Sequence, residues 1–320
     1  MTNDKIQAFG DWARVAIDQH SHKMFKHEPE VLKDKDPEEL HQMRVGMRRL
    51  RSAMAGFSTA LDLPASAREK KVSKVAKILG QLRDLDVLGE ALETEYKPTL
   101  PKKEQKELAP SFKILKKRRS EEVARVKKTL KGKTYNALKH GLKDWLEHPQ
   151  YQKIGDASIE LVLPDILLPQ ASQLLLHPGW FAEVETTGEE LQDDAKTVEK
   201  LLEENEETLH DLRKEAKRSR YQMELFASFY GEDYDRDVKA IKKVQSILGE
   251  IQDSFVLAEF LDKTLDKSID KCVPTLAAQL RQNRYQKWQT WRTIREEFRD
   301  RAFRDNLRLT LQKPNSESSS

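Results

Sequence analysis

The sequence predicts an all-α protein built from an internal duplication. Apolar residues recur at three- and four-residue spacing along almost the whole chain, whereas the alternation typical of strands is scarce. Only 12 Gly and 12 Pro occur among 320 residues, and Lys, Glu, Leu, Arg and Ala are heavily used, which favours long helices. Two sequence motifs also recur at one fixed offset, so we expect two related helical halves with pseudo-twofold symmetry.

The repeat consists of two motif pairs. LHQMRVGMRRLRSAMAGF (residues 40–57) aligns with LHDLRKEAKRSRYQMELF (residues 209–226), at an offset of 209 − 40 = 169. LGQLRDLDVL (79–88) aligns with LGEIQDSFVL (248–257), and 248 − 79 is 169 again. Because two separate motif pairs share one offset with no net gap, we interpret the chain as a duplication of one helical unit.

Helix starts and the spacing of apolar residues predict the individual elements. Asp36 is a suitable N-cap, Pro37 suits the first helical position, and Glu39 completes a capping box. A helix is therefore expected from Pro37 to about residue 60. The other helices are expected at about residues 4–26, 65–95, 105–130, 134–147, 188–230, 235–266 and 272–311.

We expect one domain, residues 1–312, made of a first repeat (about 1–150), a connector (151–187) and a second repeat (188–312). The stretch 148–187 contains four prolines and two glycines, which favours a connector with a short helix near 166–176. The tail 313–320, KPNSESSS, is expected to be disordered.

Overall composition excludes several classes of protein but identifies no partner. The chain has 57 Lys and Arg against 54 Asp and Glu, a net charge of +3, so a polyanion site would require segregated charge. The single Cys272 excludes an intramolecular disulfide and a cysteine-based zinc site. The N-terminus has no signal-peptide pattern, and Pro164, Asp165 and Pro169 interrupt the most apolar stretch. We therefore expect a cytoplasmic protein with no membrane span.

The repeated motif places cations on one helix face, twice. At 100° per residue, the side chains of "ridge 1" fall within about 80° of arc and extend over roughly 15 Å. Ridge 1 consists of His41, Arg44, Arg48 and Arg51. Its counterpart, "ridge 2", consists of His210, Arg213, Lys217 and Arg220.

The charge of the ridges indicates an anion site. Residues 41–51 contain four Arg and no acid, and stacked cations without partners repel one another and weaken a helix. The alternative is a solvated basic face, or a ridge neutralised by acids of neighbouring helices. Retention of the charge in both copies favours anion binding. The repeated lysines of the next helix in each half are expected to face the ridges across a groove if the helices pack as hairpins. These lysines are Lys70, Lys74 and Lys77, with Lys239 and Lys243 in the second copy.

Other chemistries have weaker support. No HExxH pattern, Walker A loop or GxGxxG loop occurs, so we expect no cofactor and no resident metal. A metal role for His41 and His210 would require Asp84 and Asp253 to approach them in space. Trp288 and Trp291 have the helical spacing of core residues. Residues 101–133 contain thirteen Lys and Arg against four Glu, which suits either a solvated helix face or a nucleic-acid site.

The quoted motifs resemble those of the CHAD family, the conserved-histidine α-helical domain, over about residues 1–310. HQMRVGMRRLRSAMAGF and HDLRKEAKRSRYQMELF are similar to its basic motif, and LGQLRDLDVL and LGEIQDSFVL to the motif that follows. The resemblance implies a pair of four-helix bundles about a pseudo-twofold axis. It also implies binding of inorganic polyphosphate in a basic channel or groove, and association with polyphosphate granules.

The resemblance carries the anion-binding role to specific positions. These are His41, Arg44, Arg48, Arg49, Arg51 and Lys74, with His210, Arg213, Lys217, Arg218, Arg220 and Lys243 in the second copy. Lys214, Glu215, Gln252 and Phe255 depart from the first copy, which puts equal strength of the two half-sites in question.

We therefore expect a stand-alone CHAD protein that binds polyphosphate without catalysis. One alternative is a helical RNA- or DNA-binding protein. Another is a metal-dependent phosphohydrolase, or a phosphocarrier that uses His41 or His210. Oligomeric state is not indicated by the sequence.

Overall fold

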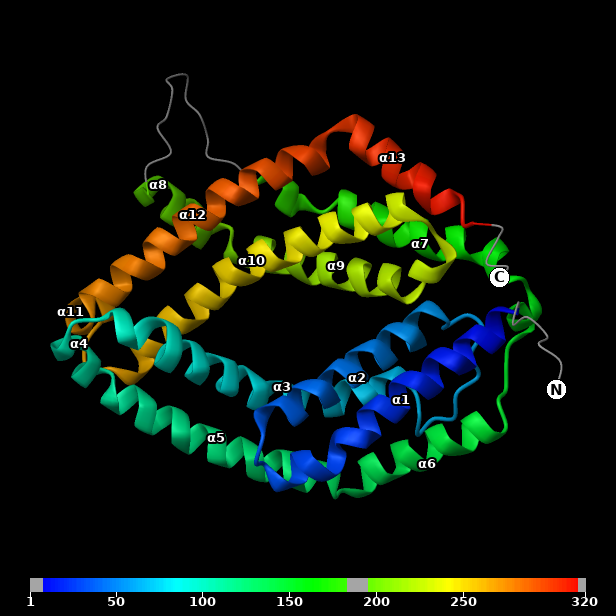
Figure 1. Ribbon diagram of the computed structural model, residues 1–320, viewed down its shortest axis with the longest axis horizontal. Helices are drawn as coiled ribbons and strands as arrows, with labels where there is room; N and C mark the ends of the chain where they lie inside the picture. The colour runs from blue at the N-terminus through cyan, green and yellow to red at the C-terminus, as the bar shows by residue number, and fades with distance from the viewer. Residues whose placement is uncertain (1–7, 183–194, 316–320) are drawn as a thin grey trace. The chain divides into compact units, whose positions relative to one another are not determined.

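The computed structural model describes residues 8–182 and 195–315, and these residues form an all-helical structure (Figure 1). Two isolated bridges, Ala8–Ser158 and Leu61–Tyr151, are the extended pairings recorded in this part of the chain. The predicted all-α fold class is therefore confirmed. The helices are α1 (Phe9–Lys33), α2 (Pro37–Gly56), α3 (Glu69–Glu90), α4 (Lys102–Glu107), α5 (Ala109–Leu130), α6 (Lys133–Glu147), α7 (Ile159–Leu175), α8 (Ala195–Glu204), α9 (Glu206–Leu225), α10 (Glu232–Thr264), α11 (Ile269–Cys272), α12 (Pro274–Arg299) and α13 (Arg301–Gln312).

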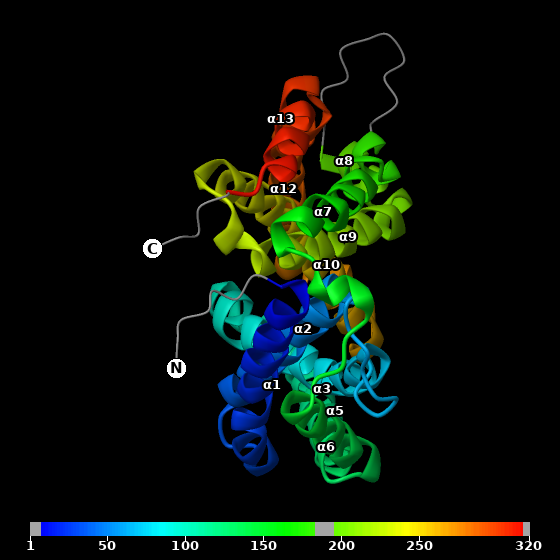
Figure 2. The same cartoon turned by 90° about the vertical axis from the view of Figure 1, so that its right-hand side faces the viewer.

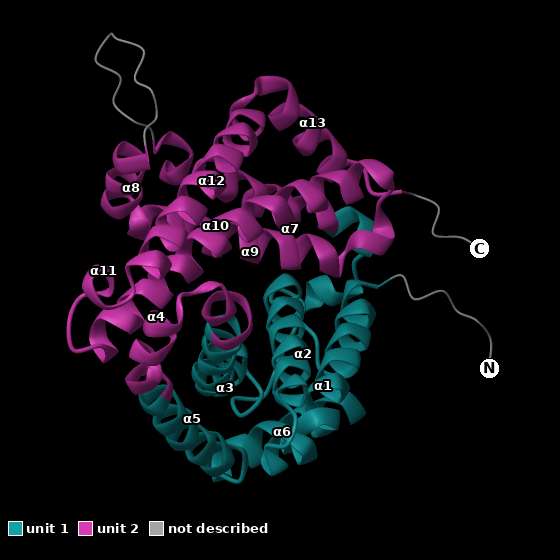
Figure 3. Ribbon diagram, turned by 60° about the vertical axis from the view of Figure 1, so that its left-hand side comes forward, with its two compact units in different colours: residues 1–92, 113–162 teal, residues 93–112, 163–320 magenta. Residues whose placement is uncertain are grey.

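The chain divides into two compact units (Figure 3). Unit 1 comprises residues 1–92 and 113–162, and unit 2 comprises residues 93–112 and 163–320. In unit 1, α2 packs against α1 on one side and α3 on the other, and α1 and α2 lie side by side in both views (Figures 1 and 2). In unit 2, α10 packs against both α9 and α12.

Unit 2 has an aromatic core that the sequence spacing predicted in part. Trp288 and Trp291 are 1% and 0% exposed, which confirms them as core residues. Trp180 stacks on Trp291 at 5.3 Å and on Phe298 at 4.7 Å between ring centroids. Stacked rings of this size bury a large apolar area and hold α12 against the short turn at 178–181.

Within unit 2, a buried carboxylate ties α4 to the start of α12. Glu104 of α4 is 7% exposed and accepts hydrogen bonds from the backbone N–H and the hydroxyl of Thr275, at 3.1 and 2.6 Å. It also accepts from the N–H of Leu276 at 3.4 Å. Glu104 thereby satisfies amides of the first turn of α12, which have no partner within the helix.

The start of α2 follows the prediction only in part. Asp36 is the N-cap, and its carboxylate accepts from the N–H of Glu38 at 2.8 Å. The predicted capping box is wrong, because the Glu39 carboxylate contacts His27 Nδ1 at 2.7 Å, which anchors α2 to α1. The helix also ends at Gly56, short of the expected residue 60.

Several predicted boundaries are corrected by the structure. The expected helix 188–230 breaks at Asn205 into α8 and α9, and its first residues, 188–194, lie outside the described residues. The expected helix 272–311 breaks at Asp300, whose carboxylate accepts from the Phe303 N–H at 2.9 Å and begins α13. At Asp300 an N-cap overrides a periodicity that continues through the break, whereas at Asn205 the side-chain amide donates to the Leu201 carbonyl near the end of α8 at 3.0 Å.

Two more segments differ from the prediction. α3 ends at Glu90, before the expected residue 95, and a π-helical turn, Ala91–Tyr96, follows. The short helix predicted near 166–176 is the longer α7, which accommodates Pro164 and Pro169. Each proline removes one backbone hydrogen bond, and burial of the apolar side chains of α7 offsets that loss. The predicted tail lies outside the described residues from residue 316 on.

One segment meets a length and composition test for a membrane span. Among residues 8–182 and 195–315, Ile159–Phe181 is long enough and has a mean hydropathy of 1.3. Leu163, Leu167 and Leu174 of this segment are buried within the protein. A buried helix of a protein core passes the same test, so this result is weak evidence for a span.

Each unit contains a guanidinium group that joins three helices, which we call an arginine clamp. In unit 1, Arg119 of α5 contacts Asp86 of α3 at 2.7 Å and Asp34, at the end of α1, at 2.8 and 3.0 Å. Burial raises the pKa of Asp86, and the bonds to Arg119 oppose that shift. The hydrogen bond to Asp34 raises the pKa of Arg119, so the arginine stays charged.

The clamp of unit 2 has the same plan. Arg284 of α12 contacts Glu199 of α8 through Nε at 2.9 Å and through Nη2, and it donates to Ser254 of α10 at 2.9 Å. Its guanidinium lies over the Phe255 ring at 4.5 Å. The two arginines are separated by 284 − 119 = 165 residues and their carboxylate partners by 199 − 34 = 165 residues. This spacing differs by four residues from the 169-residue offset of the sequence repeat, so the two clamps are similar in plan and the duplication stays a prediction.

We predict that Arg284→Ala lowers the free energy of unfolding by about 3 kcal/mol, because it removes a buried cation and leaves the half-buried Glu199 carboxylate without its partner. Replacing both residues by methionine should restore most of the loss. The measurement is urea unfolding followed by circular dichroism. Arg281→Ala is the matched control, since Arg281 forms an exposed pair with Asp270 and should cost below about 1 kcal/mol. Equal losses in the two alanine variants would contradict the clamp.

Candidate functional site

Ridge 1 lies along the side of α2 that faces α3. Arg44 Nη1 donates to the backbone carbonyl of Ala76 at 3.2 Å. A Cβ atom at Gly80 would lie 2.7 Å from the same Nη1, so this glycine gives Arg44 room to lie on the backbone of α3. Arg51, at the far end of the ridge, contacts Glu69 at 2.6 Å. The ridge therefore follows the contact between α2 and α3 over its whole length.

Ridge 2 lies in the same way on the side of α9 that faces α10. A Cβ atom at Gly249 would lie 3.1 Å from Arg213 Nε, so the second glycine of the repeat also makes room for an arginine. Arg220 contacts Glu224 at 2.7 Å and donates to the Gln245 side chain at 3.0 Å. Its guanidinium also covers the Tyr221 ring at 4.6 Å. The repeated Leu-Gly motif thus has a physical role next to each ridge.

Exposure recurs at the matched positions of the two copies. All members of ridges 1 and 2 are half-buried, and the apolar positions between them, such as Met43 and Leu212, are buried. Arg49 and its counterpart Arg218 are exposed, as are Lys74 and Lys243. The agreement extends the sequence repeat to the packing of the side chains. The pseudo-twofold relation of the two units remains a prediction.

Arg49 and Arg218 lie beside the ridges instead of on them. Each is about 100° around its helix from the preceding ridge cation. Burial lowers the pKa of His20 on α1 to about 4, and the charge of Arg49 adds to this effect, which places Arg49 toward α1. Arg218 contacts Glu215 at 2.5 Å. These two arginines therefore extend the basic surface toward other helices.

The repeated lysines are exposed residues of the helices that pack against the ridges. Lys239 and Lys243 are about 80° and 120° around α10 from Gly249, and both line a pocket shared with α12. Lys74 is likewise about 120° around α3 from Gly80. Their role in the anion site stays a prediction.

Carboxylates neutralise parts of both ridges, which the sequence analysis gave only as an alternative. Glu69 pairs with the end of ridge 1, and Glu224 with the end of ridge 2. The position matching Gly46 in the first copy is Glu215, which is 6% exposed and hydrogen-bonded to the Gln170 side chain. Glu215 lies on the side of α9 away from ridge 2, so this half carries a buried carboxylate on its ridge helix that the first half does not have at the matching position.

Both ridge histidines are shifted toward the neutral form. Burial is the main cause that lowers the pKa of His41, and Arg83, Arg48 and Arg44 add to it while Glu38 opposes it. Burial also lowers the pKa of His210, with further contributions from Lys214 and Arg213 and opposition from Asp211 and Glu206. Nδ1 of His210 is buried with no hydrogen-bond partner among the described residues. Both imidazoles are therefore neutral at pH 7 before a ligand binds.

The described residues contain no group of three or more His, Cys, Asp or Glu side chains placed to hold a metal ion. The arrangement instead provides cations, amide groups and neutral imidazoles along two helix faces. Such groups bind anions by charge-assisted hydrogen bonds and need no covalent step.

Comparison with known proteins identifies the family. The model of the CHAD domain matches residues 15–262. The crystal structure of the CHAD domain from the plant Ricinus communis is 22% identical and has a TM-score of 0.59, with 97% of this chain and 93% of that chain covered. PptA from Streptomyces chartreusis is 12% identical with a TM-score of 0.63, and the match covers 91% of this chain and 99% of that chain. No curated protein matches. The structural likenesses show the shared fold, and the matched residues show that the chain belongs to the CHAD family.

Proposed function

We propose that this protein binds inorganic polyphosphate through ridges 1 and 2 and does not chemically change it. The observation that carries the proposal is the repeated contact of a ridge arginine with a helix glycine, Arg44 with Gly80 and Arg213 with Gly249. The same histidine, arginine and basic positions accompany that contact in both units. Membership in the CHAD family supports the same ligand through the resemblance described above.

The chemistry of the ridges suits a linear phosphate chain. Polyphosphate carries about one negative charge per phosphate and presents no bases to be read. Arginine offers planar, bidentate donors to phosphate oxygens, and lysine offers a compact charge. A ridge with a cation on nearly every turn, about 5.4 Å apart along the axis, can contact successive parts of one chain. Because ion pairing with a polyanion releases counterions, affinity should fall steeply with salt.

The two half-sites are proposed to differ in strength. Glu215 adds a buried carboxylate to the helix that carries ridge 2 and pairs with Arg218, whereas Gly46 occupies its position on the helix that carries ridge 1. Arg220 is also held by both Glu224 and Gln245. Ridge 1 is therefore the stronger of the two. We place the protein in the cytoplasm, at polyphosphate granules where these form.

The composition of the basic segment 101–133 favoured nucleic-acid binding, but the contacts of its side chains weaken that alternative. Its Arg119 is used in the clamp of unit 1, and Arg125 donates to Gln81 at 2.8 Å. The segment is also divided between α4 and α5. Part of its charge therefore has a structural role, and nucleic acid is best treated as a competing ligand in the binding test.

The double variant Arg48→Ala, Lys217→Ala should lower the affinity for long-chain polyphosphate by about tenfold or more, since each side chain supplies a charge-assisted contact. Binding is measured by fluorescence anisotropy of labelled polyphosphate at two salt concentrations, with single-stranded nucleic acid as competitor. The salt dependence should also become weaker in the variant.

The matched control is Lys143→Ala, Lys200→Ala, which removes the same charge from side chains that are 74% and 77% exposed and lie away from the ridges. This control should bind nearly as well as the wild type. If both double variants lose the same affinity, net charge and not the ridges determines binding. If nucleic acid competes as well as polyphosphate at matched charge, the nucleic-acid alternative gains support.

Binding should strengthen as the pH falls below about 6.5 and should be level above about pH 7.5. The pKa values of His41 and His210 are lowered in the free protein, so both are neutral at pH 7 and gain no charge until the pH falls further. A bound polyanion raises these pKa values, and linkage then requires proton uptake to favour binding. Affinities measured from about pH 5.5 to 8.5 test this, and a His41→Gln, His210→Gln variant should lose the acid gain. An acid gain retained in that variant would assign it to other groups.

Gly80→Ala should reduce polyphosphate affinity several-fold without reducing stability. The new Cβ displaces only the end of the flexible Arg44 side chain, and alanine favours a helix by about 0.5–1 kcal/mol relative to glycine. Gly89→Ala is the control on the same helix, because its Cβ would meet the end of the Leu115 side chain, away from ridge 1. Thermal unfolding and polyphosphate binding are measured for both. Unchanged affinity in Gly80→Ala would show that the position of Arg44 does not matter to the site.

A further inference from the structure

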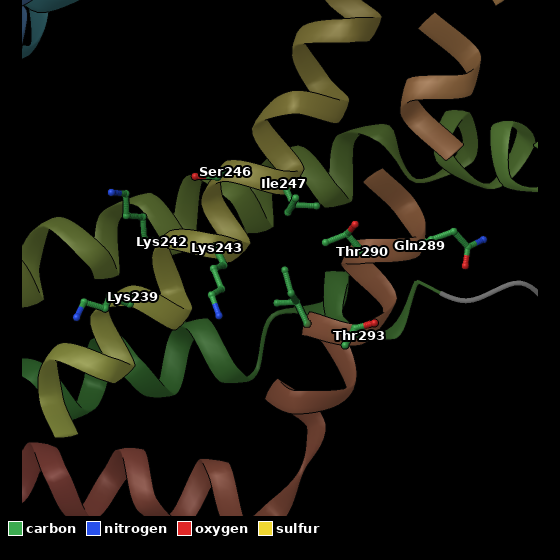
Figure 4. Close-up of a pocket in the computed structure, with 9 residues that line it drawn as sticks. Lys239, Lys242, Lys243, Ser246, Ile247, Gln289, Thr290 and Thr293 are labelled. Carbon is green, nitrogen blue, oxygen red and sulfur yellow. The ribbon is translucent and has the colours of Figure 1, made fainter. Parts of the chain in front are cut away.

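A pocket of unit 2 lies between α10 and α12, with a volume of about 860 Å³ (Figure 4). Its α10 side carries Lys239, Lys242 and Lys243, and its α12 side carries Gln289, Thr290 and Thr293. Figure 4 shows Lys243 extending into the space between α10 and α12, whereas the side chains of Lys239 and Lys242 extend away from α12 at the rim of the pocket. Lys243 and Ile247 lie about 120° and 160° around α10 from Gly249, which meets ridge 2, so most of the pocket lies on another side of the helix, with Lys242 at its edge toward ridge 2.

Three lysines give the pocket a positive charge, and no other lining residue carries a negative charge to balance it. Lys242 and Lys243 follow Lys239 by three and four residues, so the three side chains fall within about 100° of arc on α10 and their charges repel one another. No acidic residue lines the pocket. All three lysines are exposed, and no ion pair of theirs is recorded with any described residue. Glu250 of the same helix is instead engaged by Lys287 of α12. An anion of more than one charge would relieve this repulsion.

The remaining surface of the pocket is neutral and partly apolar. Ile247 of α10 and Ile294 of α12 contribute aliphatic surface between the two helices. Two threonine hydroxyls, the Gln289 amide and the Ser246 hydroxyl add donors and acceptors without charge. Cations at one side, with apolar and neutral polar groups at the other, are suited to a ligand that has two chemically different parts.

The size and lining favour an organic phosphate over an inorganic one. Sites for organic ligands of moderate size occupy roughly 300–1,000 Å³ and combine apolar surface with a few polar groups. A single phosphate would leave most of this volume unused, and a polyphosphate chain has no apolar group to place against the isoleucines. A nucleoside triphosphate has both a multiply charged chain and a flat, weakly polar base with hydrogen-bonding edges.

We infer that this pocket binds a nucleoside triphosphate or a closely similar organic phosphate, with its phosphates on the α10 lysines and its base against Ile247 and Ile294. The site is separate from ridges 1 and 2 and does not depend on their proposed function. Lys243 is thereby reassigned from the polyphosphate site to this pocket.

The test uses the full chain and isothermal titration with ATP, tripolyphosphate and adenosine as probes. ATP should bind more tightly than either of its parts. Lys239→Gln, Lys243→Gln should weaken ATP binding by about tenfold or more, because two charge-assisted contacts are lost. Ile247→Ala should weaken ATP binding and leave the weaker tripolyphosphate binding unchanged. Lys267→Gln, Lys271→Gln is the matched control, since both lysines are exposed residues of unit 2 outside the pocket, and it should bind ATP like the wild type.

Three outcomes would overturn the inference. The first is ATP affinity that is equal in the pocket variant and in its matched control. The second is tripolyphosphate binding as tight as ATP binding, with no effect of Ile247→Ala, which would mean that only charge is recognised. The third is loss of ATP binding in the ridge variant Arg48→Ala, Lys217→Ala, which would place ATP on the ridges. Because polyphosphate binding is measured in parallel on the same variants, failure of this site and failure of the ridges give different results.

Discussion

The structure of each unit depends on one arginine whose guanidinium contacts side chains of two other helices and so joins three helices. In unit 1, α2 lies between α1 and α3, and Arg119 joins Asp34 at the end of α1 to Asp86 on α3. This bridge fixes the distance between the two neighbours of the helix that carries ridge 1. In unit 2, Arg284 joins α8, α10 and α12. It therefore holds α10, the helix that packs against ridge 2 of α9, to α12. A guanidinium can do this because its planar donors bind in fixed directions.

The fixed helix pairs make stacked cations tolerable. Basic side chains on one helix face repel one another, yet the side chains of each ridge pack against a neighbouring helix and are half-buried. Gly80 and Gly249 allow the arginines to approach the backbone, and Glu69 and Glu224 neutralise the outer ends. The histidines remain neutral through burial, which limits the positive charge until an anion arrives. The ridge is thus a compromise between the stability of the helix pair and attraction for a ligand.

The sequence predicted the helical class, the repeat and the ridge positions because these depend on periodicity and on local spacing. Breaks at Asn205 and Asp300 were missed, since apolar periodicity continues across them and only capping and packing end the helices. The clamps were missed because Asp34 and Arg119 are far apart in the chain and no short motif connects them. That Lys74 and Lys243 belong to the anion site stays a prediction, and both lie about 120° around their helices from Gly80 and Gly249. Glu215 shows that two copies of a motif can diverge at a buried position, since Gly46 lies against the α1 backbone and Glu215 accepts a hydrogen bond from Gln170 of α7.

The most direct measurement is residue-level chemical footprinting of arginine and lysine side chains, with and without long-chain polyphosphate, read by mass spectrometry. The account predicts that polyphosphate protects the ridge cations, above all Arg48 and Lys217, while the exposed Lys143 and Lys200 keep their reactivity. It also predicts stronger protection of ridge 1 than of ridge 2. Protection confined to the basic segment 101–133, with the ridges as reactive as in the free protein, would contradict the account.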